Sequence, residues 1–500
     1  MSRARRLLPL LVLAALGLGA VPLSAATSFD GALEDPLFQL GPIQGDARLR
    51  EALALMEAGK PGEALNAVDA AMAAGLSSAA AYELRGMALA GVGRIEESLS
   101  AFDKALSFEP RQASTWTNLG IVQLAIGSVD EAEASFRAAL DIDPSDRRAH
   151  QRLGLIAIGR GQTQAAIEHL EAGIRDLPGQ YVGVKVDLAR LYLQVGRADD
   201  AIAILAAWQD DRTAPDDVLQ ALADAHLAKG DSDAAKDLFA RIAGRGTSAS
   251  GAVGLARLAV AAGRLEEAAR ILNDADRSFP DDVQLDVEVG NLLGAQGNYE
   301  QALARYRDGL GTDRDNPALL KGESLALFRL DRVEDALAPA VRLSQRSGAV
   351  AGDYLWLGTL QEKLGRMDAA VAAYERTLEL APDAWIALNN LAAVLSDQDP
   401  SRALGLARRA AELAPGNPDV QDTLAWAELK AGHAEEAATR YATLRTTEPA
   451  SPVLAFRHGL ALIAAGQVKE GRHLLQHALD LDPTFPGSDE AHRILAAASP

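Results

Sequence analysis

The chain is 500 residues long, contains no cysteine and carries a formal net charge of −20 at pH 7. The absence of cysteine excludes disulfide bonds, thiolate zinc sites and cysteine nucleophiles. The negative charge argues against nucleic acid and anionic lipid as partners, because phosphate groups repel it.

Residues 1–26 have the pattern of an export signal. Three arginines precede an apolar run over residues 7–18, and small residues ending at Ala26 stand where a signal peptidase cleaves. Cleavage is expected before Thr27, which predicts a periplasmic or secreted protein with no direct membrane insertion. The alternative is an uncleaved membrane anchor, although the apolar run is short for a membrane span.

Residues 27–44 are rich in glycine and proline and are expected to form a linker. From residue 45 to about residue 485, a pattern of small residues, aromatic residues and prolines recurs every 34 residues. A fixed period of this length predicts an all-α stack of about thirteen copies of one small unit. Clear examples are Gly86, Gly93, Phe102 and Pro110, followed at the same spacing by Gly120, Gly127, Phe136 and Pro144.

Each copy is predicted to be a pair of antiparallel helices. A glycine such as Gly93 or Gly127 is expected to end the first helix in the left-handed conformation. Acidic residues then begin the second helix, where they complement the helix dipole, and a proline closes it. Small residues at positions eight and twenty would let the two helices approach closely. A large residue at position 24 would fill the space toward the next copy.

Some copies depart from this pattern. In the ninth, Asp331 replaces the turn glycine and Pro339 lies inside the second helix. The sixth ends in Gly244-Arg245-Gly246 and lacks the closing proline. We therefore predict a bend or a softer stretch over about residues 309–350. The final residues, 486–500, are expected to form a tail with one capping helix.

The repeated pattern resembles the tetratricopeptide repeat family over about 440 residues. This resemblance implies a right-handed α-solenoid that acts as a non-catalytic protein-binding scaffold. Asn389-Asn390-Leu391-Ala392 and the stretch from Asp422 to Trp426 also resemble exported repeat proteins of bacterial exopolysaccharide and exosortase (PEP-CTERM) systems. Those proteins are usually longer and carry a lipid-anchoring cysteine that this chain lacks. The narrower resemblance implies a role in exopolysaccharide or surface-protein assembly and export. An alternative is a regulatory subunit of an envelope glycosyltransferase or hydrolase.

In this family, positions two, five, nine and twelve of the first helix face the concave surface, and an asparagine at position six often binds a peptide backbone. On that basis Arg257, Asn291 and Lys321 would form a polar groove for an extended peptide or a partner helix. The alternative is that they are ordinary solvated residues. Trp426 and Phe456 form a second candidate patch, with core packing as the alternative for Phe456. Asp224 and Asp422 also stand at inward-facing positions. The partner-binding candidates are Asn118, Arg190, Arg257, Asn291, Lys321, Asn389, Asn390 and Trp426.

The sequence contains no phosphate-binding loop and no Gly-x-Ser-x-Gly elbow, so neither catalysis nor a cofactor is expected. His473 and His477 are four residues apart and share one helix face, with His492 nearby. Such spacing can bind zinc, but no His-Glu-x-x-His motif accompanies it. We therefore predict no metal site.

Overall fold

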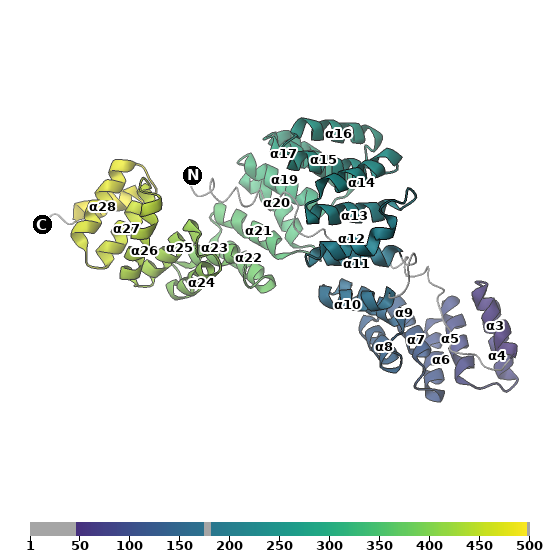
Figure 1. Ribbon diagram of the computed structural model, residues 1–500. Helices are drawn as coiled ribbons and strands as arrows, with labels where there is room; N and C mark the ends of the chain where they lie inside the picture. The colour runs from purple at the N-terminus through teal and green to yellow at the C-terminus, as the bar shows by residue number, and fades with distance from the viewer. Residues whose placement is uncertain (1–46, 175–181, 498–500) are drawn as a thin grey trace. The chain divides into compact units, whose positions relative to one another are not determined.

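The computed structural model describes residues 47–174 and 182–497, and Figure 1 shows their path. Within these ranges the chain forms 27 α-helices and one 3₁₀ turn, and no strand. The predicted signal segment over residues 1–26 and the linker over residues 27–44 lie outside the described residues. None of the described helices combines the length and apolar character that a membrane span requires.

The chain divides into two compact units, residues 1–258 and residues 259–500, with the boundary inside α15. The described helices of the first unit are α3 (Ala47–Glu57), α4 (Pro61–Ala73), α5 (Ala79–Gly91), α6 (Ile95–Phe108), α7 (Ala113–Ala125), α8 (Val129–Ile142), α9 (Arg147–Gly159), α10 (Thr163–Ile174), α11 (Val182–Gln194), α12 (Ala198–Leu205), η2 (Ala206–Trp208), α13 (Asp216–Lys229), α14 (Ser232–Arg245) and α15 (Ser250–Ala261).

The second unit continues the same alternation of first and second helices. Its described helices are α16 (Leu265–Ser278), α17 (Val283–Ala295), α18 (Tyr299–Thr312), α19 (Pro317–Arg329), α20 (Val333–Ser344), α21 (Ala351–Lys363), α22 (Met367–Leu380), α23 (Trp385–Leu395), α24 (Pro400–Leu413), α25 (Pro418–Lys430), α26 (Ala434–Thr447), α27 (Pro452–Ala464), α28 (Val468–Leu481) and α29 (Ser488–Ala497).

Within each unit, helices pack mainly against their neighbours in the chain. In the first unit α5 packs on α6 and α7 on α8, and the first helices α5, α7 and α9 also contact one another in turn. In the second unit α17 contacts α19, and α23 contacts α25, in the same way. Local packing of this kind, repeated along the chain, is the α-solenoid architecture that the 34-residue period predicts.

A left-handed residue ends the first helix of most repeats, as predicted. Gly93 and Gly127 have φ values of +79° and +80°, and Asp331 takes the same conformation at +60° in the ninth repeat. This conformation is unfavourable for a residue with a Cβ atom, but aspartate tolerates it better than most. Asp331 therefore preserves the turn at an energetic cost that glycine avoids.

The aromatic residue at position 24 packs against the first helix of its own repeat as well as toward the next repeat. A Cβ atom on Gly120 would lie 2.7 Å from the Phe136 ring, so only glycine leaves room for the ring there. In the eighth repeat, the Tyr306 ring closes on Gly290 of its own repeat and on Gly322 of the following one. The predicted role of position 24 is thus confirmed and extended to the inside of its own helix pair.

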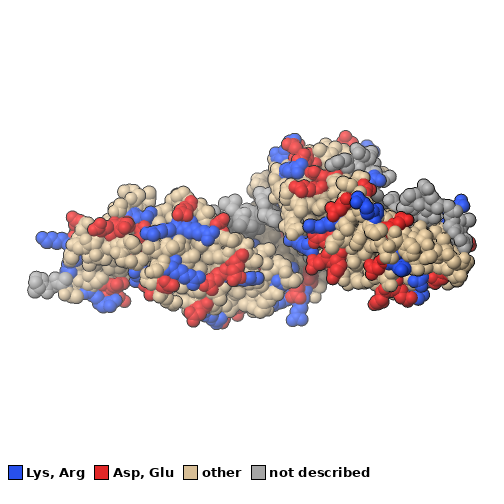
Figure 2. All heavy atoms as spheres, turned by 90° about the horizontal axis from the view of Figure 1, so that it is seen from below, with Lys and Arg blue, Asp and Glu red and all other residues tan. Residues whose placement is uncertain are grey.

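Charged residues of both signs are interspersed over the face of the molecule seen in Figure 2. Many of them pair between neighbouring repeats. Arg366 Nη2 lies 2.6 Å from a carboxylate oxygen of Glu334, and Arg402 Nη2 lies 2.6 Å from one of Glu375. Because these pairs are partly exposed, each contributes at most about 1 kcal/mol, and the buried apolar contacts dominate the stability.

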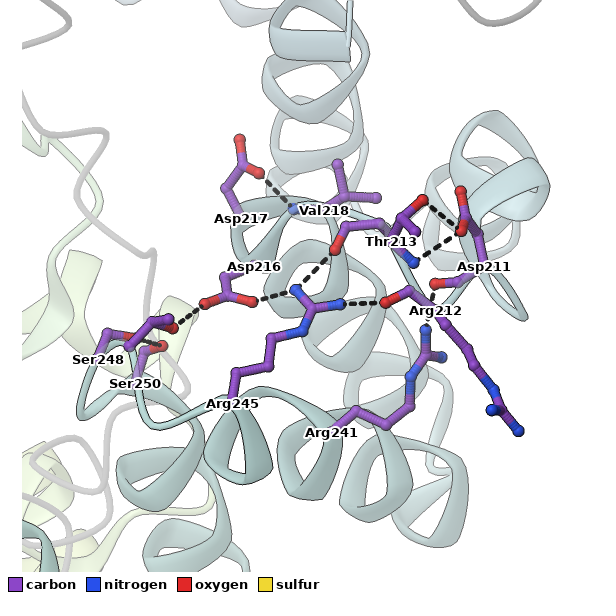
Figure 3. Close-up of polar contacts among 12 residues, drawn as sticks. Asp211, Arg212, Thr213, Asp216, Asp217, Val218, Arg241, Arg245, Ser248 and Ser250 are labelled. Atoms are coloured by element: carbon purple, nitrogen blue, oxygen red, sulfur yellow. Dashed lines mark hydrogen bonds and ion pairs between the residues drawn. The ribbon is translucent and has the colours of Figure 1, made fainter.

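Two arginines of α14 hold an irregular connection in place in the first unit. Here α12 has only eight residues and is followed by the short η2 turn and a loop leading to α13. Figure 3 shows Arg245 pointing at the loop, where it donates to the Arg212 and Ala214 carbonyl oxygens at 2.9 and 2.7 Å and pairs with Asp216. Arg241 donates to further loop carbonyl oxygens. These hydrogen bonds satisfy backbone groups that the shortened helix leaves unpaired.

Candidate protein-binding face

Three residues at predicted inward-facing positions of the first unit lie on successive first helices. Arg190 is on α11, Asp224 on α13 and Arg257 on α15. Asp224 is half-buried, and burial raises the pKa of its carboxyl group, while the nearby charges of Arg257 and Arg190 oppose that rise. Asp224 therefore lies within electrostatic reach of both guanidinium groups. We refer to Arg190, Asp224 and Arg257 together as the cluster.

Neighbouring polar groups orient this cluster. A carboxylate oxygen of Asp187 lies 3.5 Å from Arg190 Nη1, one helical turn away on α11. Gln220 Nε2 donates to Asp224 Oδ1 at 3.2 Å. The Arg190 side chain is 38% exposed and Arg257 is exposed, so both guanidinium groups can be reached from solvent. The cluster can therefore offer several hydrogen-bond donors to a partner.

Asn118 has a different environment from the one predicted. Its side chain is fully buried, and its Nδ2 donates to Glu83 Oε1 at 3.0 Å, while its Oδ1 accepts from Arg148 at 3.2 Å. The amide is used to join three successive repeats inside the protein. The prediction that Asn118 contacts a partner is therefore wrong for this structure, because the preceding repeat supplies a buried carboxylate at bonding distance.

The Glu83 carboxyl group is the centre of this buried cluster. Gln112 Nε2 donates to its second oxygen at 2.8 Å. Burial raises the pKa of Glu83 to about 7, with hydrogen bonds from Thr115, Ser114 and Asn118 acting in the opposite direction. A group with this pKa changes its protonation near neutral pH, so the cluster makes this part of the first unit sensitive to pH.

Asn291 and Lys321 are both exposed residues of the second unit. Asn291 Oδ1 accepts a hydrogen bond from the Tyr306 hydroxyl group at 2.8 Å. Burial raises the pKa of the Asp353 carboxyl group, and the positive charge of Lys321 opposes that rise. Arg257 belongs to the first unit, so the predicted groove over Arg257, Asn291 and Lys321 draws on both units and stays a prediction.

The two asparagines of the eleventh repeat differ in exposure. Asn389 is only 8% exposed, whereas Asn390 is half-buried. Asn390 Nδ2 lies 3.4 Å from the Tyr374 hydroxyl oxygen, which donates to Glu362 at 2.7 Å. At that distance the Asn390 contact is weak. Asn390 is therefore the better placed of the two to meet a partner, and Asn389 belongs largely to the interior.

Two cations of the second unit lie near the Trp426 ring. Lys430 Nζ is 4.6 Å and the Arg457 guanidinium carbon is 5.0 Å from its ring centroid. Arg457 in turn pairs with Asp422 at 2.5 Å. Phe456, in contrast, is buried and packs against Phe485 with ring centroids 5.4 Å apart, so the alternative of core packing is confirmed for it.

The two histidines of α28 have a sequence spacing that can bind zinc. In the part of the chain that the structure describes, no group of three or more histidine, aspartate or glutamate side chains is arranged to hold a metal ion. His473 is exposed and His477 is half-buried on the same helix.

The sequence pattern did not predict one class of polar contact, which joins one repeat to the next. An acceptor at position five bonds to a donor at position six of the next repeat, 35 residues later. Glu83 and Asn118 form one such pair, and Asp422 and Arg457 form another. Such a contact can be recognised in the sequence as an acidic residue followed 35 positions later by a side chain that donates hydrogen bonds. Position-six residues in this pattern bond to the preceding repeat.

Sequence profiles described as tetratricopeptide repeat match most of the chain between residues 49 and 458. One profile matches residues 49–115, 86–147, 117–181, 289–351 and 357–418, and a second matches residues 157–225, 226–286 and 394–458.

Individual relatives match only short stretches. The chain is 33% identical over 117 residues to the protein CTR9 homolog of Arabidopsis thaliana, which is 23% of this chain and 11% of that protein. It is 33% identical over 93 residues to the Hsp70-Hsp90 organizing protein of Triticum aestivum, which is 19% of this chain and 16% of that protein.

Among solved structures, a chain of the APC/C hetero-tetramer Cut9-Hcn1 aligns with 91% of this chain and 89% of its own length, at 14% identity and a TM-score of 0.44. The assignment to a family rests on the sequence profiles and the repeated helix pairs. The fold is typical of non-catalytic scaffolds. The chain belongs to the tetratricopeptide repeat family.

Proposed function

We propose that the protein is a non-catalytic scaffold that holds a peptide segment or helix of a partner protein against the face formed by its first helices. The observation that carries this proposal is the cluster of Arg190, Asp224 and Arg257 on three successive first helices. Guanidinium groups bind carboxylates and carbonyl oxygens through several hydrogen bonds. Because the helices already hold these groups, the scaffold loses little conformational freedom on binding.

Charge reversal tests the role of this cluster. In the double variant Arg190→Glu and Arg257→Glu, capture of the native partner from cells is expected to fall at least about tenfold, because two attractive charges become repulsive. Lys236→Glu on α14 is the matched control, since it changes the charge of an exposed second-helix residue in the same unit. Equal partner recovery with the double variant and the control contradicts the proposal.

The second unit supplies a further set of proposed contacts. Asn390 and Trp426 are half-buried, Asn291 and Lys321 are exposed, and all four lie on first helices. Aromatic and amide side chains of this kind anchor peptide backbones and side chains at interfaces. In this proposal, these four residues contact a partner through the first helices of the second unit. Trp426→Ala is expected to weaken capture, with Phe108→Ala on a second helix as the control for loss of a partly exposed ring.

The proposed setting is the bacterial cell envelope, in the assembly or export of an exopolysaccharide or surface protein. The support is the signal-like sequence of residues 1–26 and the resemblance of the stretch from Asn389 to Trp426. In a host of this kind, protein recovered from the periplasm is expected to begin at Thr27. Recovery of the chain with its first 26 residues intact in the cytoplasmic fraction contradicts this part of the proposal.

A further inference from the structure

A hollow of about 420 Å³ lies in the second unit, away from the residues discussed so far. It is bounded by three consecutive helices, α26, α27 and α28. Its walls combine apolar and basic side chains, with Glu470 as the acidic residue among them. The others are Arg445, His458, Leu462, Lys469, His473 and Leu474.

The hollow opens on a different side of α27 from the face proposed for peptide binding. His458 and Leu462 are the seventh and eleventh residues of their repeat, whereas the inward-facing positions are two, five, nine and twelve. Positions seven and nine are two residues apart and therefore point roughly 200° away from each other around the helix. A ligand in the hollow would thus not occupy the first-helix face.

Two buried nitrogen atoms in the hollow have no hydrogen-bond partner. His458 is 8% exposed, and its Nδ1 is unpartnered, as is the Nε of Arg445. Buried polar atoms are nearly always hydrogen-bonded in folded proteins. Both atoms belong to side chains that line one hollow, so a single ligand bound there could supply both missing partners.

Arg445 and Lys469 outnumber Glu470 among the charged side chains that line the hollow, and this balance favours an anion. Among the described residues, neither Arg445 nor Lys469 takes part in an ion pair. Burial and the charge of Arg445 lower the pKa of His458 to about 4, so its imidazole ring is neutral at pH 7. A guanidinium group and a neutral imidazole donor together suit an anion with a single charge.

The apolar walls restrict the kind of anion further. Leu462 is buried and Leu474 is half-buried, so part of a ligand would lie against hydrocarbon. Removing a doubly charged phosphate group from water is costlier than removing a carboxylate, because the cost grows with charge. A carboxylate attached to an apolar body matches both parts of the lining.

We propose that this hollow binds a carboxylate whose apolar body packs against Leu462 and Leu474 while its oxygens accept hydrogen bonds from Arg445 and His458. The exposed Lys469 adds long-range attraction at the rim. Two sources carry this chemistry, the C-terminal residue of a peptide and a free organic acid. The site goes beyond the proposed scaffold function, because it lies on another side of α27.

Titration of the full chain with defined probes tests the site. The probes are hexanoate for a free acid, N-acetyl-leucine for a peptide terminus, and hexanamide as a neutral control of the same shape. Calorimetry and NMR signals of labelled histidine rings are the readouts. We expect saturable binding of at least one carboxylate with a Kd below about 10 mM, a shift of the His458 signal, and at least about tenfold weaker binding of hexanamide. The tighter carboxylate identifies the source.

Variants separate the site from general charge effects. Arg445→Gln is expected to weaken carboxylate binding at least about tenfold and Lys469→Gln by about threefold, because the first removes a direct donor and the second a rim charge. Lys363→Gln on α21 is the control, since this lysine is exposed in the same unit. The exposed position of Lys469 keeps the test valid if Arg445→Gln does not fold. Absence of saturable carboxylate binding, equal binding of hexanamide, or full affinity in both hollow variants overturns the proposal.

Discussion

Asn118 and Asn390 occupy the same position in their repeats but have different roles. Each is the sixth residue of a first helix, in α7 and α23 respectively. Asn118 is buried and bonds to Glu83 at position five of the preceding repeat. At the equivalent place before Asn390 stands Leu355, which has no acceptor in its side chain. The preceding repeat therefore decides whether an asparagine joins two repeats or remains near the surface.

The Asp422–Arg457 pair supports the same rule with different residue types. A side chain at position six reaches toward position five of the repeat before it, and an acidic residue there engages it. Assignments made by repeat position alone do not consider this neighbour. The comparison between Asn118 and Asn390 therefore provides a direct way to test which polar residues of the scaffold are structural.

The largest effect is expected for Asn118→Leu. This change removes the buried hydrogen bond that Asn118 donates to Glu83 and the one that it accepts from Arg148, which costs about 3 kcal/mol. Asn390→Leu, its counterpart, should cost less than about 1 kcal/mol. Hydrogen exchange of amides in α7 and α23 measures the two local free energies of opening. Equal losses at both positions contradict the distinction.

The second prediction concerns the pH dependence of the first unit. The pKa of Glu83 is about 7 in the folded state and near 4.5 in an exposed state, so folding favours its protonated form. Its stabilising contribution is complete below about pH 4.5 and is lost as pH rises through 7. Glu83→Gln should therefore stabilise α5 and α7 by about 2 kcal/mol at pH 8 and leave them nearly unchanged at pH 4.

Hydrogen exchange of the α5 and α7 amides at the two pH values measures this effect. The second unit serves as the internal control, because the substitution should leave the α23 amides unaffected. A variant that is destabilised equally at pH 4 and pH 8 shows that the buried carboxylate needs its charge in the folded state, contrary to this account.

A smaller effect is expected from Tyr374→Phe in the second unit. The Tyr374 hydroxyl group donates to Glu362 and lies near Asn390, so its removal should cost about 1 kcal/mol. Tyr299→Phe is the control, because the structure gives the Tyr299 hydroxyl group no hydrogen bond to a described residue. Denaturant unfolding measures the free energy of unfolding of both variants. If Tyr374→Phe loses no more stability than the control, the hydrogen bonds of Tyr374 do not order Asn390.

The smallest change in stability is expected for Asn390→Ala. Its weak contact with Tyr374 should make the loss below about 0.5 kcal/mol, while capture of the partner protein decreases severalfold if the amide meets the partner. Unfolding and capture are measured on the same preparation. A loss of stability without a loss of capture identifies Asn390 as a structural residue like Asn118.

Most of the fold could be predicted from the sequence, because the 34-residue period fixes where helices begin and where turns need a left-handed residue. The second, third and fourth first helices begin at Ala79, Ala113 and Arg147, 34 residues apart. The site could be predicted only in part. Position in the repeat gives the direction of a side chain, as for Arg190 and Arg257, but not the neighbour that engages it, as for Asn118.

Site-specific photocrosslinking in cells tests the central claim most directly. A photoreactive amino acid at Arg190, Asp224 or Arg257 is expected to label one and the same partner protein, because the three side chains lie together on the first helices. The same group at Lys236 on α14 should leave that partner unlabelled. Labelling of the partner from Lys236, together with none from the three first-helix positions, contradicts the account.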